Sequence, residues 1–442
     1  MTLDTALPRP VGSRLPTIVQ TALYWMFPRR TLRRWQARYG DVIAASVLPM
    51  GDIVFLCDVG DIKELMRADP ALFPAGVANA KLGGPFSEHS MLISDGPRHT
   101  SSRALLMPAF HGRAVRERVE EITGIVEAHL RTWPVDRPFP LHGRCEQIAL
   151  DVILRIVMGV DERGLDDVRA AMLRLTQVES LLELFLSAGL LGRLLPFARR
   201  RQRVLAESHD RLLAYIQASR NSPGLAARAD AAALLMRATD EDGEPLSDRA
   251  VEDQLITLLI AGYETTATAL AWTFERLVRT PEVLARATRA AAEDDDEYLD
   301  AVVKESLRAR TVIPDLSRMA TADTDFAGHR IRAGVVLAPC LDIVHESPEV
   351  FDEPMRFRPE RFLSDRGATA NWLPFGGGIR RCLGAAFAQT EMRTIIKQLL
   401  RCYEFIPTSA PDERMSRRHI TTAPGRGAVV TVRARTALPT RG

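Results

Sequence analysis

The sequence predicts one large, mainly α-helical fold with a minor β portion. Helical periodicity dominates from about Asp58 to Arg310, and runs of β-branched residues are short and lie toward the two ends of the chain. No internal repeat divides the 442 residues. The range 220–246 is rich in Ala, Asp, Gly and Pro, and we expect it to be an exposed connection and not a domain boundary. We therefore expect a single domain over residues 33–442, preceded by an N-terminal segment over residues 1–32.

The composition is that of an ordinary soluble globular protein, with 46% hydrophobic and 26% charged residues. A net charge of +2 provides no strong field for nucleic acid or another acidic polymer, so no nucleic-acid partner is expected. The five cysteines are scattered, odd in number and never spaced as C-x-x-C. This pattern argues against a disulfide framework or a structural zinc site, and it favours a reducing, cytoplasmic compartment.

The N-terminal segment contains one apolar stretch, Leu15–Phe27, and no signal-peptide pattern. The stretch is too short to span a bilayer, and Pro16 and Gln20 interrupt it. Four arginines follow, at positions 29, 30, 33 and 34. Two interpretations are open: the stretch packs onto the fold, or it lies on a membrane surface as an amphipathic helix. Packing is the interpretation we favour.

Short β-strands are expected in three places. Asp41–Leu48 and Ile53–Cys57 flank a Pro-Met-Gly-Asp turn and predict a hairpin. Further strand signals lie at Arg330–Leu337 and at Ala428–Arg433.

One long helix is expected over Val251–Thr280, with Ser247 as its start signal and Pro281 as its stop. About thirty residues at about 1.5 Å each give a rod of about 45 Å, which is long enough to cross a whole domain. The middle of this helix is apolar on all sides, which predicts burial.

Four residues in the buried part of this helix are candidates for chemistry: Gly262, Glu264, Thr265 and Thr266. A buried carboxylate is costly unless it is partnered or used. Gly262 weakens the helix locally, so we expect Ala261 and Thr265 to border a gap that admits a diatomic molecule or a water. From the residues alone, a surface-turned glutamate beside a capping threonine explains the pattern as well.

The most unusual loop of the chain is LPFGGGIRRCLG, where Cys382 follows three glycines and precedes an apolar helical run over Ala385–Leu400. The partial positive charge of a helix N-terminus stabilises a nearby thiolate. With no second cysteine close by, an iron–sulfur cluster or a zinc ion lacks ligands, whereas haem needs only one axial protein ligand. A buried structural cysteine after a flexible loop is the alternative.

The pattern Phe375-x-x-Gly378-x-Arg380-x-Cys382-x-Gly384 resembles the haem-ligand signature of the cytochrome P450 superfamily, in its bacterial haem-thiolate form. The resemblance implies haem b as cofactor, with Cys382 as the ligand of the iron and Phe375, Arg380 and Gly384 against the cofactor.

The stretch AGYETT is similar to the oxygen-activation stretch of the same superfamily. The resemblance implies that Ala261 borders the haem, that Thr265 holds a hydrogen bond to bound dioxygen, and that Glu264 helps to relay protons. Thr265 and Glu264 are the two expected catalytic residues.

The pair Glu305 and Arg308 lies three residues apart on an expected helix, Asp300–Arg308, and therefore on one face. The spacing alone means little, since an exposed ion pair is worth less than about 1 kcal/mol. Its position between the long helix and the cysteine loop resembles the superfamily's buried Glu-Arg-Arg triad. The resemblance makes Arg361 the third member and gives all three a structural role.

Haem carries two propionates that need cations. His99 and Arg103 are one helical turn apart and match the superfamily's H-x-x-x-R helix, Arg318 follows Pro314 at the place of a propionate arginine, and Arg380 lies two residues before the ligand. The resemblance implies that these four side chains hold the propionates.

The implied reaction is the insertion of one oxygen atom from dioxygen into an unactivated C–H bond. Electrons are expected from a separate ferredoxin and ferredoxin reductase. Arg393, Lys397 and Arg401 form a stripe on the helix after Cys382, which either steers an acidic ferredoxin or is an ordinary solvated face. The very apolar range 178–198 indicates a small lipophilic substrate or weak membrane-surface contact, with core packing as the alternative.

Other classes fit the same loop. A haem-based sensor or electron carrier needs no acid–alcohol pair, so Glu264 and Thr265 argue against it. A peroxide-driven hydroxylase or a haem-thiolate isomerase is closer, but such relatives usually lose that pair.

Overall fold

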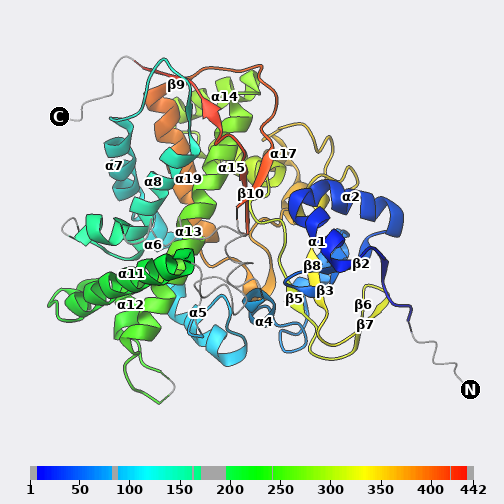
Figure 1. The fold of residues 1–442 in the computed structure, drawn as a ribbon. Coiled ribbons are helices and arrows are strands. Elements are labelled where there is room, and N and C mark those ends of the chain that lie inside the picture. The colour runs from blue at the N-terminus through cyan, green and yellow to red at the C-terminus, as the bar shows by residue number, and fades with distance from the viewer. Residues whose placement is uncertain are drawn as a thin grey trace, which may run out of the picture. The chain divides into compact units, whose positions relative to one another are not determined.

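The computed structural model describes residues 7–81, 88–161, 164–170, 196–240, 242–418 and 420–435. The chain divides into two compact units, and each is described by itself. Unit 1 comprises Met1–Ser101 and Lys304–Leu383, and unit 2 comprises Ser102–Val303 and Gly384–Gly442. Helices dominate and strands are short, so the expected mainly α fold with a minor β portion is confirmed (Figure 1). The expected division at residue 33 stays a prediction.

Unit 1 is built on a five-stranded sheet in the order β1-β2-β3-β8-β5. Its strands are β1 (Val11–Gly12), β2 (Val42–Val47), β3 (Gly51–Leu56), β8 (Val336–Pro339) and β5 (Arg318–Met319). The antiparallel pair β2–β3 is the predicted hairpin, and β3 then pairs in parallel with β8. Because side chains alternate along a strand, Phe55 and its neighbour Leu56 enter hydrophobic clusters on opposite faces of the sheet.

Two N-terminal helices cover one face of this sheet, α1 (Thr17–Met26) and α2 (Pro28–Tyr39). Tyr24 of α1 and Trp35 of α2 both contact the ring of Phe55. Helix α3 (Val59–Arg67) packs its buried residues into the cluster on the other face. Packing of the N-terminal segment is therefore confirmed for one side of α1.

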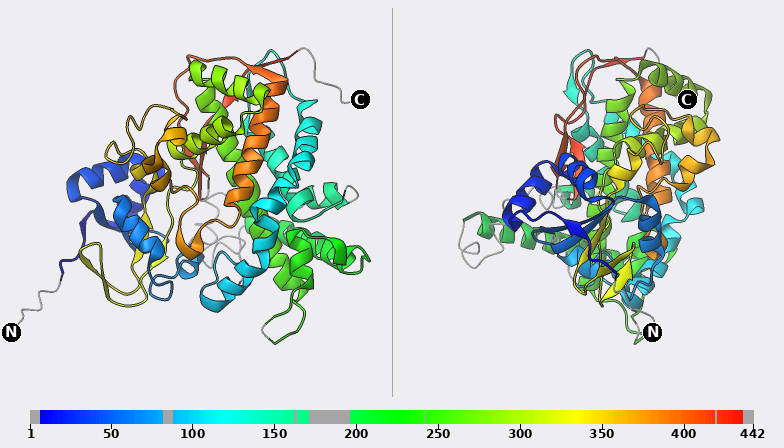
Figure 2. Two further views of the ribbon diagram at one scale, coloured as in Figure 1. Left: turned by 180° about the vertical axis from the view of Figure 1, so that it is seen from behind. Right: turned by 90° about the vertical axis from the view of Figure 1, so that its right-hand side faces the viewer.

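Unit 2 surrounds one long helix, α13 (Asp248–Leu277). The Ser247 side chain accepts a hydrogen bond from the Ala250 amide, so the predicted start signal is an N-cap. Helices α8 (His142–Val152), α11 (Pro196–Arg220) and α19 (Ala385–Cys402) pack against it (Figures 1 and 2). Among the described residues, α13 alone is long and apolar enough to cross a membrane, but 72% of its apolar window is buried in the protein.

The expected exposed connection over residues 220–246 is wrong in its middle. Helix α12 (Ala231–Arg237) lies there, and five of its seven residues are buried. Asp230 starts the helix by accepting a hydrogen bond from the Ala233 amide. The Asp and Ala residues that indicated a loop have another role here. Asp230 is the N-cap, and the alanines after it favour a helix because alanine has the highest helix propensity.

The remaining helices are α4 (Gly76–Ala80), α5 (Gly96–Phe110), α6 (Gly112–Arg116), α7 (Val119–Leu130), α14 (Pro281–Glu293), α15 (Asp296–Ala309), α16 (Leu341–His345), α17 (Arg361–Ser364) and α18 (Arg366–Ala370), with a π-helical turn at Ile153–Val157. The remaining strands form four pairs: β6 (Thr324–Phe326) with β7 (His329–Ile331), β10 (Met415–Arg418) with β11 (Thr421–Pro424), β12 (Val429–Val430) with β4 (Phe139–Pro140), and β13 (Val432–Ala434) with β9 (Tyr403–Phe405). The apolar range 178–198 lies outside the described residues, apart from its last three residues, which begin α11.

Candidate functional site

Cys382 is the one exposed cysteine of the chain, whereas the other four are buried. Its loop is closed by a 2.9 Å hydrogen bond from the Cys382 amide to the Phe375 carbonyl oxygen. Gly378 has φ of 62° and a Cβ there would overlap the carbonyl of Met66, so this position requires glycine for two reasons. Helix α19 begins three residues after Cys382, with Gly384 at its N-cap. The loop thus presents a single thiol outward, which is what one axial ligand of haem needs.

The start of the cysteine loop is held by His345, which is fully buried. The Leu373 amide donates to Nε2 of His345 at 3.2 Å, and Nδ1 lies 2.9 Å from the Thr311 hydroxyl. Burial, and then the nearby Arg308 guanidinium, lower the pKa of His345 to about 3. His345 is therefore neutral, with Nε2 as acceptor and Nδ1–H as donor. The sequence analysis missed this residue, because one histidine has no spacing signal.

The three residues of the expected triad lie together in unit 1 and are nearly inaccessible to solvent. Arg308 donates to both Glu305 oxygens at 2.8 Å, and Arg361 donates to the same carboxylate at 3.1 Å. Arg308 also donates to the His345 carbonyl oxygen at 2.7 Å, which connects the triad to the histidine that holds the loop. The same spacing at Glu353 and Arg356 gives only an exposed 3.5 Å pair. The scaffold role of the triad beneath a cofactor stays a prediction.

Arg318 is a largely buried cation whose surroundings favour the binding of an anionic group of a ligand. Burial, and then the charge of Arg380, lower the pKa of Arg318 to about 10. Arg318 donates a hydrogen bond to the adjacent Ser317 carbonyl oxygen at 3.0 Å, and no carboxylate of the described residues forms an ion pair with it. A desolvated guanidinium in this state fits a haem propionate well.

The other three expected propionate cations differ from Arg318. Arg380 is already engaged in unit 1 by Asp95 and by the carbonyl oxygens of Ser94 and Met91. His99 is buried on α5, and Arg103 follows it one turn later on the same helix. Their contacts with a propionate stay predictions.

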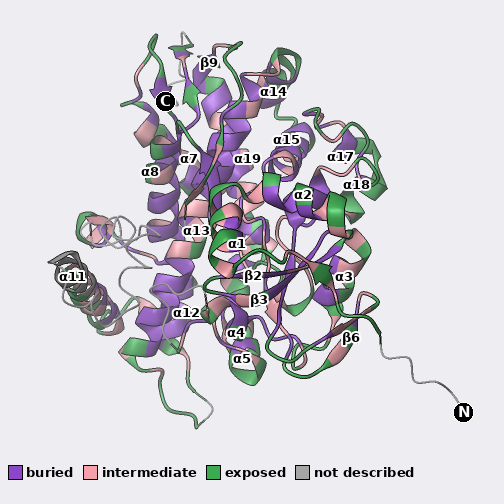
Figure 3. Ribbon diagram, turned by 45° about the vertical axis from the view of Figure 1, so that its right-hand side comes forward, coloured by how far each residue is buried: buried purple, intermediate pink, exposed green. Residues whose placement is uncertain are grey.

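In unit 2, the burial of α13 is interrupted over a short window. Its residues are buried from Ala250 to Leu259 and again from Thr266 to Glu275, whereas Ala261 is exposed and Gly262, Glu264 and Thr265 are partly exposed (Figure 3). The gap expected between Ala261 and Thr265 does not break the helix, because α13 continues through this window. The Thr265 hydroxyl donates to the Ala261 carbonyl oxygen at 2.7 Å.

Gly262 has a packing role that the sequence analysis did not foresee. A Cβ at Gly262 would lie 2.6 Å from Cδ1 of Ile153, in the π-helical turn that follows α8. The absence of a side chain therefore lets this turn pack closely against α13 at the window.

The Glu264 carboxylate is held by the β10–β11 hairpin. Its Oε1 lies 3.0 Å from Oγ1 of Thr421, which also lies 2.9 Å from the Arg418 carbonyl oxygen. Burial raises the pKa of Glu146 on α8, the charge of Arg418 opposes this shift, and the negative charge of Glu264 adds to it. Thr421 lies in a stretch, His419–Thr421, that is expected to line the substrate pocket, but no sequence signal pairs it with Glu264, and none identifies Glu146.

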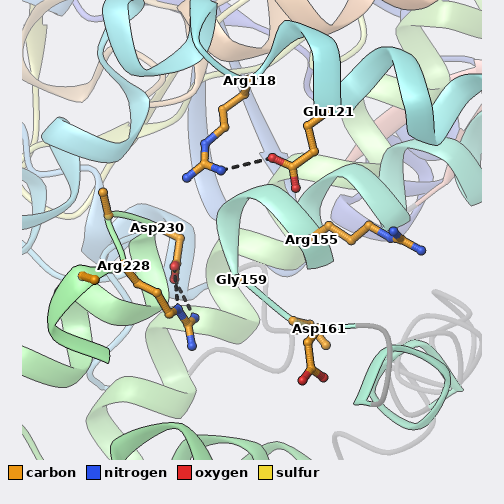
Figure 4. A pocket seen from close by; sticks show the side chains of 10 residues that line it. Arg118, Glu121, Arg155, Gly159, Asp161, Arg228 and Asp230 are labelled. Atoms are coloured by element: carbon orange, nitrogen blue, oxygen red, sulfur yellow. Dashed lines mark hydrogen bonds and ion pairs between the residues drawn. The ribbon is translucent and has the colours of Figure 1, made fainter. Parts of the chain in front are cut away.

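A separate pocket of about 560 Å³ opens in unit 2, and it contains none of the expected site residues. Figure 4 shows that two of its arginines are already paired, Arg118 with Glu121 and Arg228 with Asp230. This charged, internally paired lining suits neither haem nor a lipophilic substrate.

The comparisons with known proteins agree on one family. The family model of cytochrome P450 matches residues 8–430. A putative cytochrome P450 135B1 from Mycobacterium tuberculosis strain H37Rv is 41% identical over 433 residues, which cover 96% of this chain and 91% of the relative. A putative cytochrome P450 137 from the same strain is 36% identical, over 97% of this chain and 90% of the relative.

Two solved structures share the fold. A retinoic-acid-bound cyanobacterial CYP120A1 matches with a TM-score of 0.80 at 23% identity, over 97% of this chain and 100% of that chain. The heme domain of cytochrome P450DA matches with a TM-score of 0.82 at 22% identity, over 98% of both chains. Fold and cysteine loop thus define a haem-thiolate monooxygenase with haem b as its cofactor. The chain belongs to the cytochrome P450 family.

Proposed function

We propose that this monooxygenase inserts one oxygen atom from dioxygen into a C–H bond of a small lipophilic substrate in the cytoplasm. The observation that carries the proposal is the exposed Cys382 on a loop closed by a backbone hydrogen bond, in a chain whose other cysteines are all buried. When bound, the haem supplies the reductive activation of dioxygen, and the protein supplies its ligand, its orientation and the protons.

The cofactor would be held by the residues that the family pattern assigns to it. Cys382 would bind the iron as a thiolate, with Phe375 and Gly384 against the porphyrin. Arg318 would pair with one propionate, since a buried guanidinium with no acid partner among the described residues gains most from an anion. His99, Arg103 and Arg380 would complete the propionate contacts, and Ala261 would lie against the cofactor.

Protons would be handled by Thr265 and Glu264. The Thr265 hydroxyl, now donating to the Ala261 carbonyl oxygen, would turn to donate its hydrogen bond into the partly exposed window of α13. Glu264 would rotate between Thr421 and the window on α13, and it would take up its next proton from the partly exposed Glu146. The raised pKa of Glu146 suits a carboxyl that must hold and release protons.

A lipophilic substrate is supported by the composition of the range 178–198 and by one relative. The cyanobacterial CYP120A1 structure contains retinoic acid, an apolar molecule with one carboxylate. Contact of the range 178–198 with substrate or with membrane stays a prediction.

Ferredoxin and its reductase would supply the electrons, as is usual for bacterial members of the family. The stripe of Arg393, Lys397 and Arg401 gives this proposal little support, because all three side chains are ion-paired. Lys397 lies 2.7 Å from Asp294 and 2.6 Å from Asp296, Arg393 lies 2.8 Å from Asp300, and Arg401 lies 2.7 Å from Asp294. Steering of an acidic ferredoxin by this stripe stays a prediction, and so does the alternative of an ordinary solvated face.

Turnover distinguishes the proposal from its rivals. The purified holoenzyme would be supplied with a lipophilic substrate that shifts the haem to high spin, and with either ferredoxin, reductase, NADPH and dioxygen, or hydrogen peroxide alone. We expect product only, or at least tenfold faster, with the reductive system. Product from peroxide alone would indicate a peroxygenase, and spectral binding without any turnover would indicate a sensor or carrier.

A further inference from the structure

The N-terminal segment presents an apolar helix face to solvent. Among the described residues, fifteen large hydrophobic side chains are exposed, and seven of these lie between Leu7 and Phe27. On α1, Ile18 is 77% exposed and Met26 is 67% exposed. Such a concentration in one short segment exceeds the scattered exposure that is normal for a soluble surface.

The exposed residues of α1 share one helical face. Ile18, Val19, Ala22 and Met26 are exposed, as is Leu15 two residues before the helix, and the helical spacing of these positions places them along one stripe. Gln20 and Tyr24 are buried on the side that meets the sheet. Helix α1 is thus apolar on its outer face although its inner face already has a core to pack against.

The range 5–40, which contains α1 and α2, is strongly basic. Seven arginines and no acidic residue lie between Asp4 and Asp41, although the whole chain has a net charge of only +2. Arg29 and Arg33 are ion-paired with Glu346 in unit 1. Arg30, Arg34 and Arg38 are exposed at i, i+4 and i+8 on α2, and no ion pair within the described residues neutralises them.

We propose that α1 and α2 form a docking surface for an anionic lipid bilayer. An exposed apolar helix face inserts among acyl chains at the headgroup boundary, and nearby arginines attract anionic headgroups. An acidic protein partner would need the arginines but would not require a continuous apolar stripe. A second copy of this chain would bring seven further arginines against the first seven, so charge disfavours it.

The test is flotation of the holoenzyme with lipid vesicles. We expect it to float with vesicles of phosphatidylcholine and phosphatidylserine, and to remain largely unbound with phosphatidylcholine alone. Because attraction to an anionic surface is about 1 kcal/mol per arginine, Arg30→Gln/Arg34→Gln/Arg38→Gln should weaken binding at least tenfold. Arg116→Gln/Arg131→Gln/Arg137→Gln removes the same charge from exposed sites in unit 2 and should change binding less than twofold.

The apolar face has its own variant and control. Ile18→Ser/Met26→Ser should weaken vesicle binding at least fivefold, and Met355→Ser, at a methionine that is 68% exposed elsewhere in unit 1, should leave it unchanged. An unaltered reduced carbon monoxide spectrum verifies that each variant is folded. Equal binding to neutral and anionic vesicles, or no loss in Ile18→Ser/Met26→Ser, would overturn the proposal. The proposal would also be overturned if the protein failed to bind vesicles and instead formed a dimer that Ile18→Ser/Met26→Ser abolishes.

Discussion

Thr421 and Glu264 lie 157 positions apart in the chain, and their side-chain oxygens are 3.0 Å from each other. The contact fixes the one carboxylate in the partly exposed window of α13 to the β10–β11 hairpin. Thr421→Val keeps the shape of the side chain and removes the hydroxyl. We expect it to leave haem and substrate binding unchanged and to raise NADPH consumption per product several-fold. Thr421→Ser should restore coupling, and coupling retained in the valine variant would contradict a role for the contact.

Thr265 should be needed for coupling more than for binding. In Thr265→Ala the donor to the Ala261 carbonyl oxygen, and by our proposal into the window of α13, is lost. We expect an unchanged substrate-induced spectral shift, with at least tenfold less product per NADPH and more hydrogen peroxide. Thr265→Ser serves as the control that keeps the hydroxyl. Tight coupling in the alanine variant would refute the assignment.

Because of His345, the free energy of unfolding should decrease as the pH falls below about 6.5. The pKa of His345 is about 3 in the folded protein against an ordinary value of 6.5, so the folded state binds fewer protons between these values. The stability due to the neutral imidazole is therefore complete above pH 6.5 and is lost as the pH falls toward 3, by up to about 1.4 kcal/mol per pH unit. Unfolding by urea between pH 7.5 and 5 measures the slope, which we expect to be shallower in His345→Gln. An identical slope would contradict a buried neutral histidine.

Glu391 and Glu305 are both fully buried, but they should respond in opposite ways. Neither carboxylate oxygen of Glu391 has a hydrogen-bond partner within the described part of the chain, and burial raises its pKa well above the ordinary value. We expect Glu391→Met to increase the free energy of unfolding by about 1–3 kcal/mol. Glu305→Gln should decrease it by about 3–5 kcal/mol, because two buried arginines lose their carboxylate.

The pH dependence separates the two glutamates further. A carboxyl whose folded pKa is raised destabilises the protein as the pH rises above the unfolded value of about 4.5, because the unfolded chain ionises first. The gain from Glu391→Met should therefore be larger at pH 7 than at pH 4.5. A gain independent of pH would indicate that Glu391 is ionised in the folded protein.

Local signals were sufficient for the elements that carry the site. Ser247 and the apolar run behind it located the start of α13, and the turn before Ile53 located the β2–β3 hairpin. Local signals failed where contacts are distant in the chain. The partners of Lys397 lie about 100 positions earlier, so a row of cations on one helix resembled an unpaired basic face.

Distant contacts also explain why the residues that hold the site in place could not be predicted. Thr421 and His345 act through contacts made only after folding, and single residues of these types occur throughout any sequence. Cys382 was the exception, because the glycines and arginines around it form a long pattern, in which a Cβ at Gly377 or Gly378 would lie too close to Met66.

The most direct test of the account is the absorption spectrum of the reduced carbon monoxide complex. Purified protein should show the strongly red-shifted Soret band of a thiolate-bound haem, and Cys382→Ala should lose that band while Cys402→Ala keeps it. A band that survives in Cys382→Ala would contradict the assignment of Cys382 as the iron ligand.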